Sequence, residues 1–78
     1  MGHRASDVER ARARIETHLV THPLAADTVT GVARWWIGPP HDLPLETVEA
    51  VLDLLVAEGH VVRVINPDGG VVFAAARR

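Results

Sequence analysis

The chain of 78 residues contains no cysteine, no lysine and no tyrosine, and each absence narrows what it can be. Without cysteine, neither a disulfide nor a thiolate metal site supports this small chain. All eight basic residues are arginine, in a chain rich in alanine and valine, which indicates a GC-rich bacterial genome. No apolar run approaches the roughly 18 residues that span a bilayer, and the N-terminus lacks a signal-peptide core. We therefore expect a cytoplasmic protein with no membrane partner.

Charge and composition set further limits. The formal net charge is −2, so the chain as a whole has no attraction to nucleic acid or anionic lipid. Hydrophobic residues make up 47% of the chain and charged residues 23%, which is typical of a globular protein. The length fits one small domain over residues 1–78, with an ordered core at about 6–76.

A first helix is predicted over about 6–21. Ser6 and Glu9 have the spacing of a capping box, in which each side chain accepts from the other residue's backbone. The apolar residues recur three and four positions apart and form one face: Val8, Ala11, Ile15 and Leu19. Pro23 ends the helix because it forces the residue before it out of the helical region.

A second helix is predicted over about 28–37. Asp27 or Thr28 caps its start, and Gly38, followed by Pro39-Pro40, ends it. Trp35 and Trp36 are about 100° apart on a helix, so the two rings cannot point the same way. Gly31 is expected to let this helix approach a neighbouring helix closely.

A third helix begins near Asp42 and Pro44 and ends at Gly59. Its expected buried stripe is Leu45, Val48, Leu52, Leu55 and Val56. Two β-branched runs follow at 61–65 and 71–75, and the five residues between them, which include Pro67 and Gly69, indicate a hairpin loop. The expected order is α-α-α-β-β in an α+β domain.

This order resembles the winged helix-turn-helix fold. The residues that carry the resemblance are Leu43, Thr47, Val48, Leu52, Leu55, Gly59 and Val61, with Gly70 and Phe73 on the return strand. The resemblance covers roughly residues 8–76, and a compact α+β domain without a wing is the alternative. It implies either a DNA-binding regulator or a protein-binding module, since the fold serves both.

The DNA-binding alternative meets a charge of the wrong sign. In a helix-turn-helix protein the N-terminal half of the third helix meets base edges. The residues placed there would be Glu46, Thr47, Glu49, Ala50 and Asp53. Residues 42–58 contain five acidic residues and no basic one, a local charge of −5 that opposes binding to phosphates. Transcriptional regulation through DNA would depend instead on a cluster formed by Arg10, Arg12 and Arg14, together with Thr47. Local pairs such as Arg12–Glu16 on a solvated helix face are the competing interpretation of that cluster.

A protein partner fits the sequence better. Both faces of the hairpin are substantially apolar, and one of them must remain outside the core. Small aliphatic residues that simply tolerate exposure are the simpler interpretation. Homodimerisation, or docking onto another and preferably basic protein, would cover that face. The expected interaction residues are Trp35, Glu46, Glu49, Asp53, Val62, Val64 and Val72; the alternative for the tryptophans is that both rings serve the core.

No catalytic motif is present. His18 and His22 are four residues apart on the first helix, but Leu19 stands where the gluzincin pattern needs glutamate. Ser6 is the only serine and is assigned to a helix cap, so no nucleophile has a general base beside it. We expect no enzyme, no metal, no cofactor and no small-molecule substrate. A pocket in which histidine and carboxylate groups converge would count against that expectation.

Overall fold

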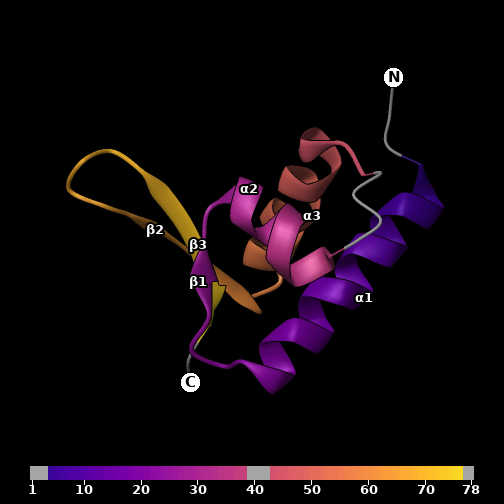
Figure 1. Ribbon diagram of the computed structural model, residues 1–78, viewed down its shortest axis with the longest axis horizontal. Helices are drawn as coiled ribbons and strands as arrows, with labels where there is room; N and C mark the ends of the chain where they lie inside the picture. The colour runs from indigo at the N-terminus through magenta and orange to yellow at the C-terminus, as the bar shows by residue number, and fades with distance from the viewer. Residues whose placement is uncertain (1–3, 39–42, 77–78) are drawn as a thin grey trace.

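The computed structural model describes residues 4–38 and 43–76 of the chain. Three helical regions and a small antiparallel sheet form a winged-helix-like arrangement, which confirms the expected α+β class (Figure 1). The helical segments are α1 (Ala5–Thr21), α2 (Val29–Gly31), the π-helical η1 (Val32–Ile37) and α3 (Leu45–Ala57), and the strands are β1 (Ala26–Asp27), β2 (Val61–Ile65) and β3 (Val71–Ala75). No helix in these ranges is long and apolar enough to cross a membrane.

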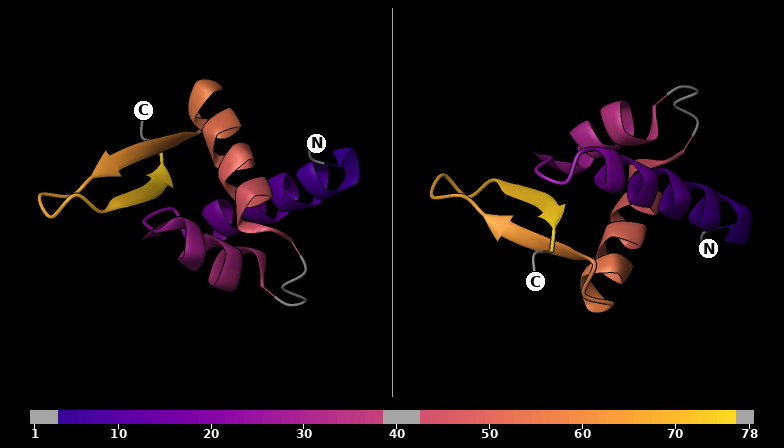
Figure 2. Two further views of the ribbon diagram at one scale, coloured as in Figure 1. Left: turned by 90° about the horizontal axis from the view of Figure 1, so that it is seen from above. Right: turned by 90° about the horizontal axis from the view of Figure 1, so that it is seen from below.

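The sheet has the order β1-β3-β2, and both pairs are antiparallel. β2 and β3 have the predicted bounds, and they pair from Val61 opposite Ala75 to Ile65 opposite Val71. β1 is an addition to the predicted order, in which Ala26 lies opposite Ala74. Two residues carry no periodic pattern, so the sequence gives no sign of this strand. The hairpin extends beyond the helices as a wing (Figure 2).

One apolar core joins every helix to the inner face of the hairpin. The buried hydrophobic residues are Ala11, Ile15, Val32, Trp36, Ile37, Val48, Val51, Leu52, Leu55, Val61 and Phe73. The predicted stripe of α3 is wrong at Leu45, whose exposed fraction is 48%, and it lacks Val51, which is buried. Leu45 lies in the first turn of α3, at the end of the stripe, whereas Val51 is three residues from Val48 on its central line.

The helix ends agree with the sequence at their glycines and differ at α1. Gly38 and Gly59 both have positive φ, which glycine adopts without a steric penalty. The capping box is wrong because α1 begins at Ala5, with extended Arg4 before it, so Ser6 lies inside the first turn. Pro44 directly precedes α3 and makes no side-chain cap. Pro39, Pro40 and Asp42 lie outside the described residues.

The predicted second helix exists, but only its first turn is α-helical. Thr28 caps it, and its hydroxyl accepts a hydrogen bond from the Gly31 N–H at 3.2 Å. From Val32 onward the segment is π-helical, with a wider turn. Gly31 is needed for a different reason from the one expected: a Cβ there would overlap the Asp27 carboxylate, not a neighbouring helix.

Candidate protein-interaction surface

The acidic face of α3 consists of Glu46, Glu49 and Asp53, which are all exposed. Val48, Val51, Leu52 and Leu55 turn to the core on the opposite side of the same helix. Because residues three, four and seven apart share a helix face, the apolar spacing that buries one side leaves the three carboxylates on the other. The structure therefore brings these predicted residues together on one surface.

Arg63 of β2 joins the wing to this acidic face. Its guanidinium donates to the Asp53 carboxylate, and its Cζ lies 5.6 Å from the centre of the Phe73 ring. One of the three carboxylates is thereby paired. Within residues 4–38 and 43–76, neither Glu46 nor Glu49 forms an ion pair, so their charges remain available to a partner. The sequence pattern gives no sign of the Arg63–Asp53 pair, because it depends on the angle between wing and helix.

A pocket of about 360 Å³ lies at the N-terminal end of the acidic face. Ala33, Leu43 and Leu45 supply apolar walls, and Thr30 and Arg34 supply polar ones. Leu45 directly precedes Glu46 in the first turn of α3. Glu49 follows Leu45 by one turn on the same side of α3, whereas the charged residue in the described lining itself is Arg34.

One tryptophan is buried and the other is exposed, as expected if Trp35 lies at the surface. Trp36 is buried, and its ring stacks on His18 with 5.0 Å between centroids. Trp35 is 68% exposed on η1, which excludes the alternative that both rings fill the core. Among the large apolar side chains in the described ranges, Trp35 offers an aromatic anchor of the kind favoured in interfaces.

The outer face of the wing carries Val62, Val64 and Val72, as well as Ala74 and Ala26 from the strands beside them. Val62 and Val64 are exposed, while Val72 is half-buried. The opposite face holds Val61 and Phe73, which are buried in the core. The predicted interaction residues thus lie on separate surfaces, since the outer wing face points away from the side on which Arg63 meets the acidic face.

Thr47 is not available to a nucleic acid. The side chain predicted to face bases is 3% exposed, because it lies toward the core side of α3. The prediction that Thr47 faces DNA bases is therefore wrong. The reason is the side of α3 on which Thr47 lies, not the charge of the helix.

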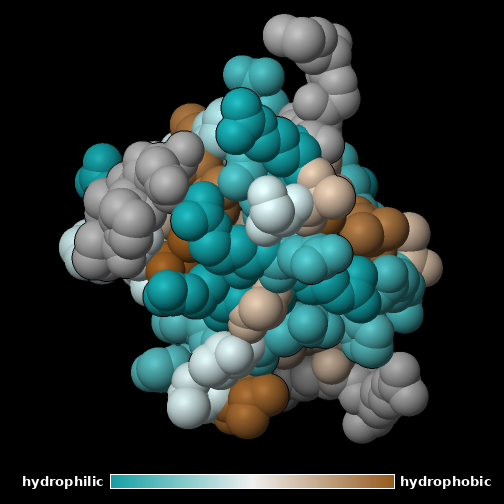
Figure 3. Space-filling model, turned by 90° about the vertical axis from the view of Figure 1, so that its right-hand side faces the viewer, coloured by the Kyte–Doolittle hydropathy of each residue, from teal (hydrophilic) through white to brown (hydrophobic). Residues whose placement is uncertain are grey.

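The three arginines of α1 do not form one cluster. Arg12 lies about half a turn from Arg10 and Arg14 on the helix. It binds Glu58 through both terminal nitrogens and approaches Glu16 at 3.7 Å, the pair expected from the sequence. Arg10 approaches Asp7 at 3.4 Å, and Arg14 donates to the Ile37 carbonyl at 3.3 Å. The surface over the α1 side of the molecule is largely hydrophilic (Figure 3).

The Arg12–Glu58 pair joins α1 to the end of α3. Its hydrogen bond raises the pKa of Arg12 and lowers the pKa of Glu58, which favours the charged form of both groups. Both terminal nitrogens of Arg12 are engaged by Glu58, so Glu16 keeps only the long contact to Nε.

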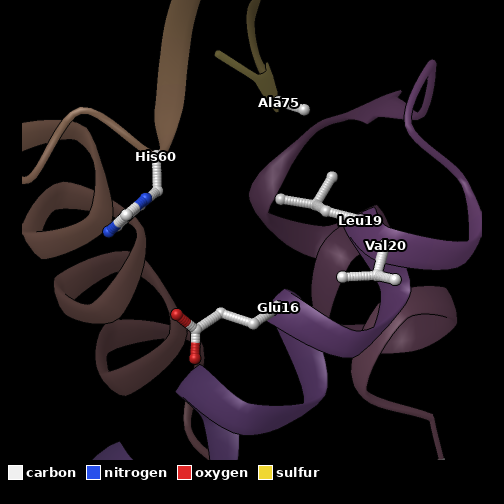
Figure 4. A pocket seen from close by; sticks show the side chains of 5 residues that line it. All are labelled: Glu16, Leu19, Val20, His60 and Ala75. Carbon is white, nitrogen blue, oxygen red and sulfur yellow. The ribbon is translucent and has the colours of Figure 1, made fainter. Parts of the chain in front are cut away.

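A second pocket, of about 250 Å³, lies between α1 and the base of the wing (Figure 4). Leu19, Val20 and Ala75 form its apolar walls, and Glu16 and His60 complete the lining. It therefore combines an imidazole with a carboxylate, the feature that counts against a non-enzymatic protein. However, His60 Nε2 lies 3.6 Å from Glu58 rather than pairing with Glu16, and none of the described residues that line the pocket carries a hydroxyl or a thiol.

His18 and His22 stack on each other instead of converging on a shared point. Their ring centroids are 4.5 Å apart and their planes differ by 19°, with the Trp36 ring on the far side of His18. Burial lowers the pKa of His18 below its ordinary value of 6.5, and the nearby His22 acts in the same direction. Within the described ranges, no three His, Cys, Asp or Glu side chains are placed to hold a metal ion.

Comparisons of the chain with known protein families, curated proteins and solved structures find no match.

Proposed function

We propose that this chain is a non-enzymatic protein-interaction module of winged-helix type, which binds a basic protein segment through the acidic face of α3 and also self-associates. The observation that carries the proposal is the exposure of Glu46 and Glu49 without an ion pair in the described part of the chain. Two adjacent carboxylates favour a partner of opposite charge, by steering the encounter and by rejecting acidic partners.

The neighbouring pocket indicates what else the partner needs. An apolar side chain of the partner would enter the space beside Ala33 and Leu45, while arginine or lysine residues near it meet Glu46 and Glu49. A segment that combines one apolar anchor with basic residues therefore suits this surface. Trp35, on η1, would extend the contact area for a larger partner.

A capture experiment with matched charge variants tests the proposal. The unmodified chain and its Glu49→Gln and Glu9→Gln variants would be used to capture proteins from the native organism, with and without nuclease. Glu9 is also an exposed glutamate, on α1, and the two variants change the net charge equally. We expect a basic partner whose capture survives nuclease and weakens in salt, and whose affinity falls about fivefold in Glu49→Gln alone.

Other outcomes of this experiment would contradict the proposal. Equal losses in the two variants would mean that only overall charge matters. Recovery of nucleic acid alone would favour the alternative, a DNA-binding regulator. That alternative has less support, because Thr47 is buried and Arg12 is engaged by Glu58.

The non-enzymatic part of the proposal rests on the lining of the pocket at Glu16 and His60. The His60 imidazole lies near Glu58 rather than paired with Glu16, and the described lining residues supply no hydroxyl or thiol for nucleophilic catalysis. We also propose a cytoplasmic location, which cell fractionation would test.

A further inference from the structure

The outer edge of β2 is a full-length strand edge with nothing paired to it in the described chain. β2 is the last strand in the order β1-β3-β2, and β1, at the other edge, has only two residues. Proteins usually protect such edges with proline, lysine or bulges, because an open edge pairs with other strands. β2 has neither residue, and its one charge, Arg63, is already bound to Asp53.

The hydrogen bonds at the two ends of the hairpin identify which backbone groups of β2 point outward. Asn66 N–H donates to the Gly70 carbonyl at 2.7 Å, and Ala76 N–H donates to the His60 carbonyl at 3.0 Å. Bonding alternates along an antiparallel strand, so even-numbered residues from 60 to 66 face β3. The N–H and C=O groups of Val61, Arg63 and Ile65 therefore point away from the sheet.

We propose that this edge binds the β2 strand of a second copy of the chain, antiparallel and related by a two-fold axis at Arg63. This inference rests on the self-association in the proposed function and assigns it a place and a register. Arg63 would lie opposite the second copy's Arg63, and Val61 opposite the second copy's Ile65. Every outward N–H and C=O group of both strands then has a partner.

The neighbouring registers are poorer. A shift of two residues in either direction leaves one of the three outward-facing residues of each copy without a partner. In the proposed register, Val62 lies opposite the second copy's Val64 on the outer face, at a position where side chains approach closely. The opposed arginines each keep their own Asp53, so the facing charges are compensated.

We choose a second copy rather than an unrelated strand because β2 is complementary to itself. A two-fold interface must be self-complementary, and an uncharged outer face meets that condition without special pairing. The resulting six-stranded sheet would also join the outer faces of both wings. Three residue pairs make a small contact, so we expect a dissociation constant on the order of 100 µM.

Cysteine trapping tests the register directly, because the natural chain has no cysteine. In the Val62→Cys/Val64→Cys double variant, the opposed positions of the two copies would lie within disulfide range. We expect covalent dimers from this variant under mild oxidation, and none from Val62→Cys or Val64→Cys alone. Dimers from one single variant would place the axis at that residue, one position from Arg63, and overturn the register.

Sedimentation velocity tests whether the edge itself is responsible. Ile65 is 69% exposed and its N–H points outward, so Ile65→Pro removes an intermolecular donor without removing one from the β2–β3 ladder. Ile65→Ala is the matched control, since it shortens the side chain but keeps the N–H. We expect Ile65→Pro to weaken dimerisation at least about tenfold more than Ile65→Ala, with circular dichroism confirming that both fold.

A natural chain that remains monomeric at about 1 mM, well above the expected dissociation constant, would overturn the inference. The same result leaves the acidic face of α3 untouched, because capture of a basic partner is measured separately. If Ile65→Pro does not fold, the cysteine variants still decide the matter. Failure of capture with intact dimers would overturn the binding of a basic partner while this inference stands.

Discussion

Replacing Gly31 with alanine should destabilise the natural protein, but it should stabilise a variant in which Asp27 has also been replaced by alanine. Gly31 has helical φ and ψ angles of −65° and −39°, so alanine alone would gain about 0.5–1 kcal/mol from lower backbone entropy in the unfolded chain. The added Cβ, however, overlaps the Asp27 carboxylate, which accepts a hydrogen bond from the Thr28 N–H at 2.8 Å. The carboxylate must therefore move.

The two costs of that movement can be estimated separately. Loss of the hydrogen bond removes about 1 kcal/mol, and an unfavourable Asp27 rotamer costs about 0.5–1.5 kcal/mol. After subtracting the helix gain, Gly31→Ala should lower the free energy of unfolding by about 0.5–2 kcal/mol. In the Asp27→Ala background the overlap is absent, and the same substitution should raise it by about 0.5–1 kcal/mol.

Urea denaturation of the four proteins in this double-mutant cycle measures the coupling between the two positions. We expect a coupling free energy of about 1.5–2.5 kcal/mol, the sum of the two costs. Thermal denaturation gives a second measure, since 1 kcal/mol shifts the Tm of a domain of this size by about 4–8 °C. Equal effects of Gly31→Ala in both backgrounds would refute the steric explanation.

Three further predictions concern stability. Trp36→Ala should lower the free energy of unfolding by about 3–5 kcal/mol and Trp35→Ala by less than about 0.5 kcal/mol, as measured by urea denaturation; similar losses would contradict their opposite exposure. The pKa of His18 is lowered in the folded state, so the stability that the neutral imidazole contributes is complete above pH 6.5 and is lost as the pH falls through the folded pKa. His18→Gln should therefore flatten the dependence of the free energy of unfolding on pH just below pH 6.5. An unchanged slope in that variant would mean that His18 is not the cause of the dependence. The pKa of Glu58 is also lowered, so the stability that its carboxylate contributes is present above the ordinary pKa of 4.5 and is lost as the pH falls through the folded pKa. Glu58→Gln should therefore reduce the loss of stability in acid. If it does not, the ion pair with Arg12 has little effect on the free energy of unfolding.

The hairpin was the most predictable part of the fold. β2 and β3 match the two predicted runs residue for residue, and the loop from Asn66 to Gly70 fixes where β2 ends and β3 begins. α1 also follows its apolar spacing, although it begins at Ala5 rather than after Ser6. Caps depend on one or two hydrogen bonds, whereas apolar spacing reports burial along the whole helix.

The candidate surface was predictable in its residues but not in its arrangement. Glu46, Glu49 and Asp53 share a face because the apolar spacing of α3 fixes what remains outside. The sequence does not show that Arg63 reaches Asp53, since these residues belong to different elements. For the same reason Arg10, Arg12 and Arg14 look like one cluster in the sequence, and yet Arg12 extends to Glu58 on another helix.

The sequence by itself determined where the main helices and the hairpin lie and that α3 presents acid to its surroundings. These properties follow from short-range spacing, turn residues and the sign of each side chain. Only the tertiary structure decided that Arg63 binds Asp53, that Gly31 makes room for Asp27, and which edge of the sheet stays open. Each of these depends on the distance and angle between elements, which packing sets and local sequence does not encode.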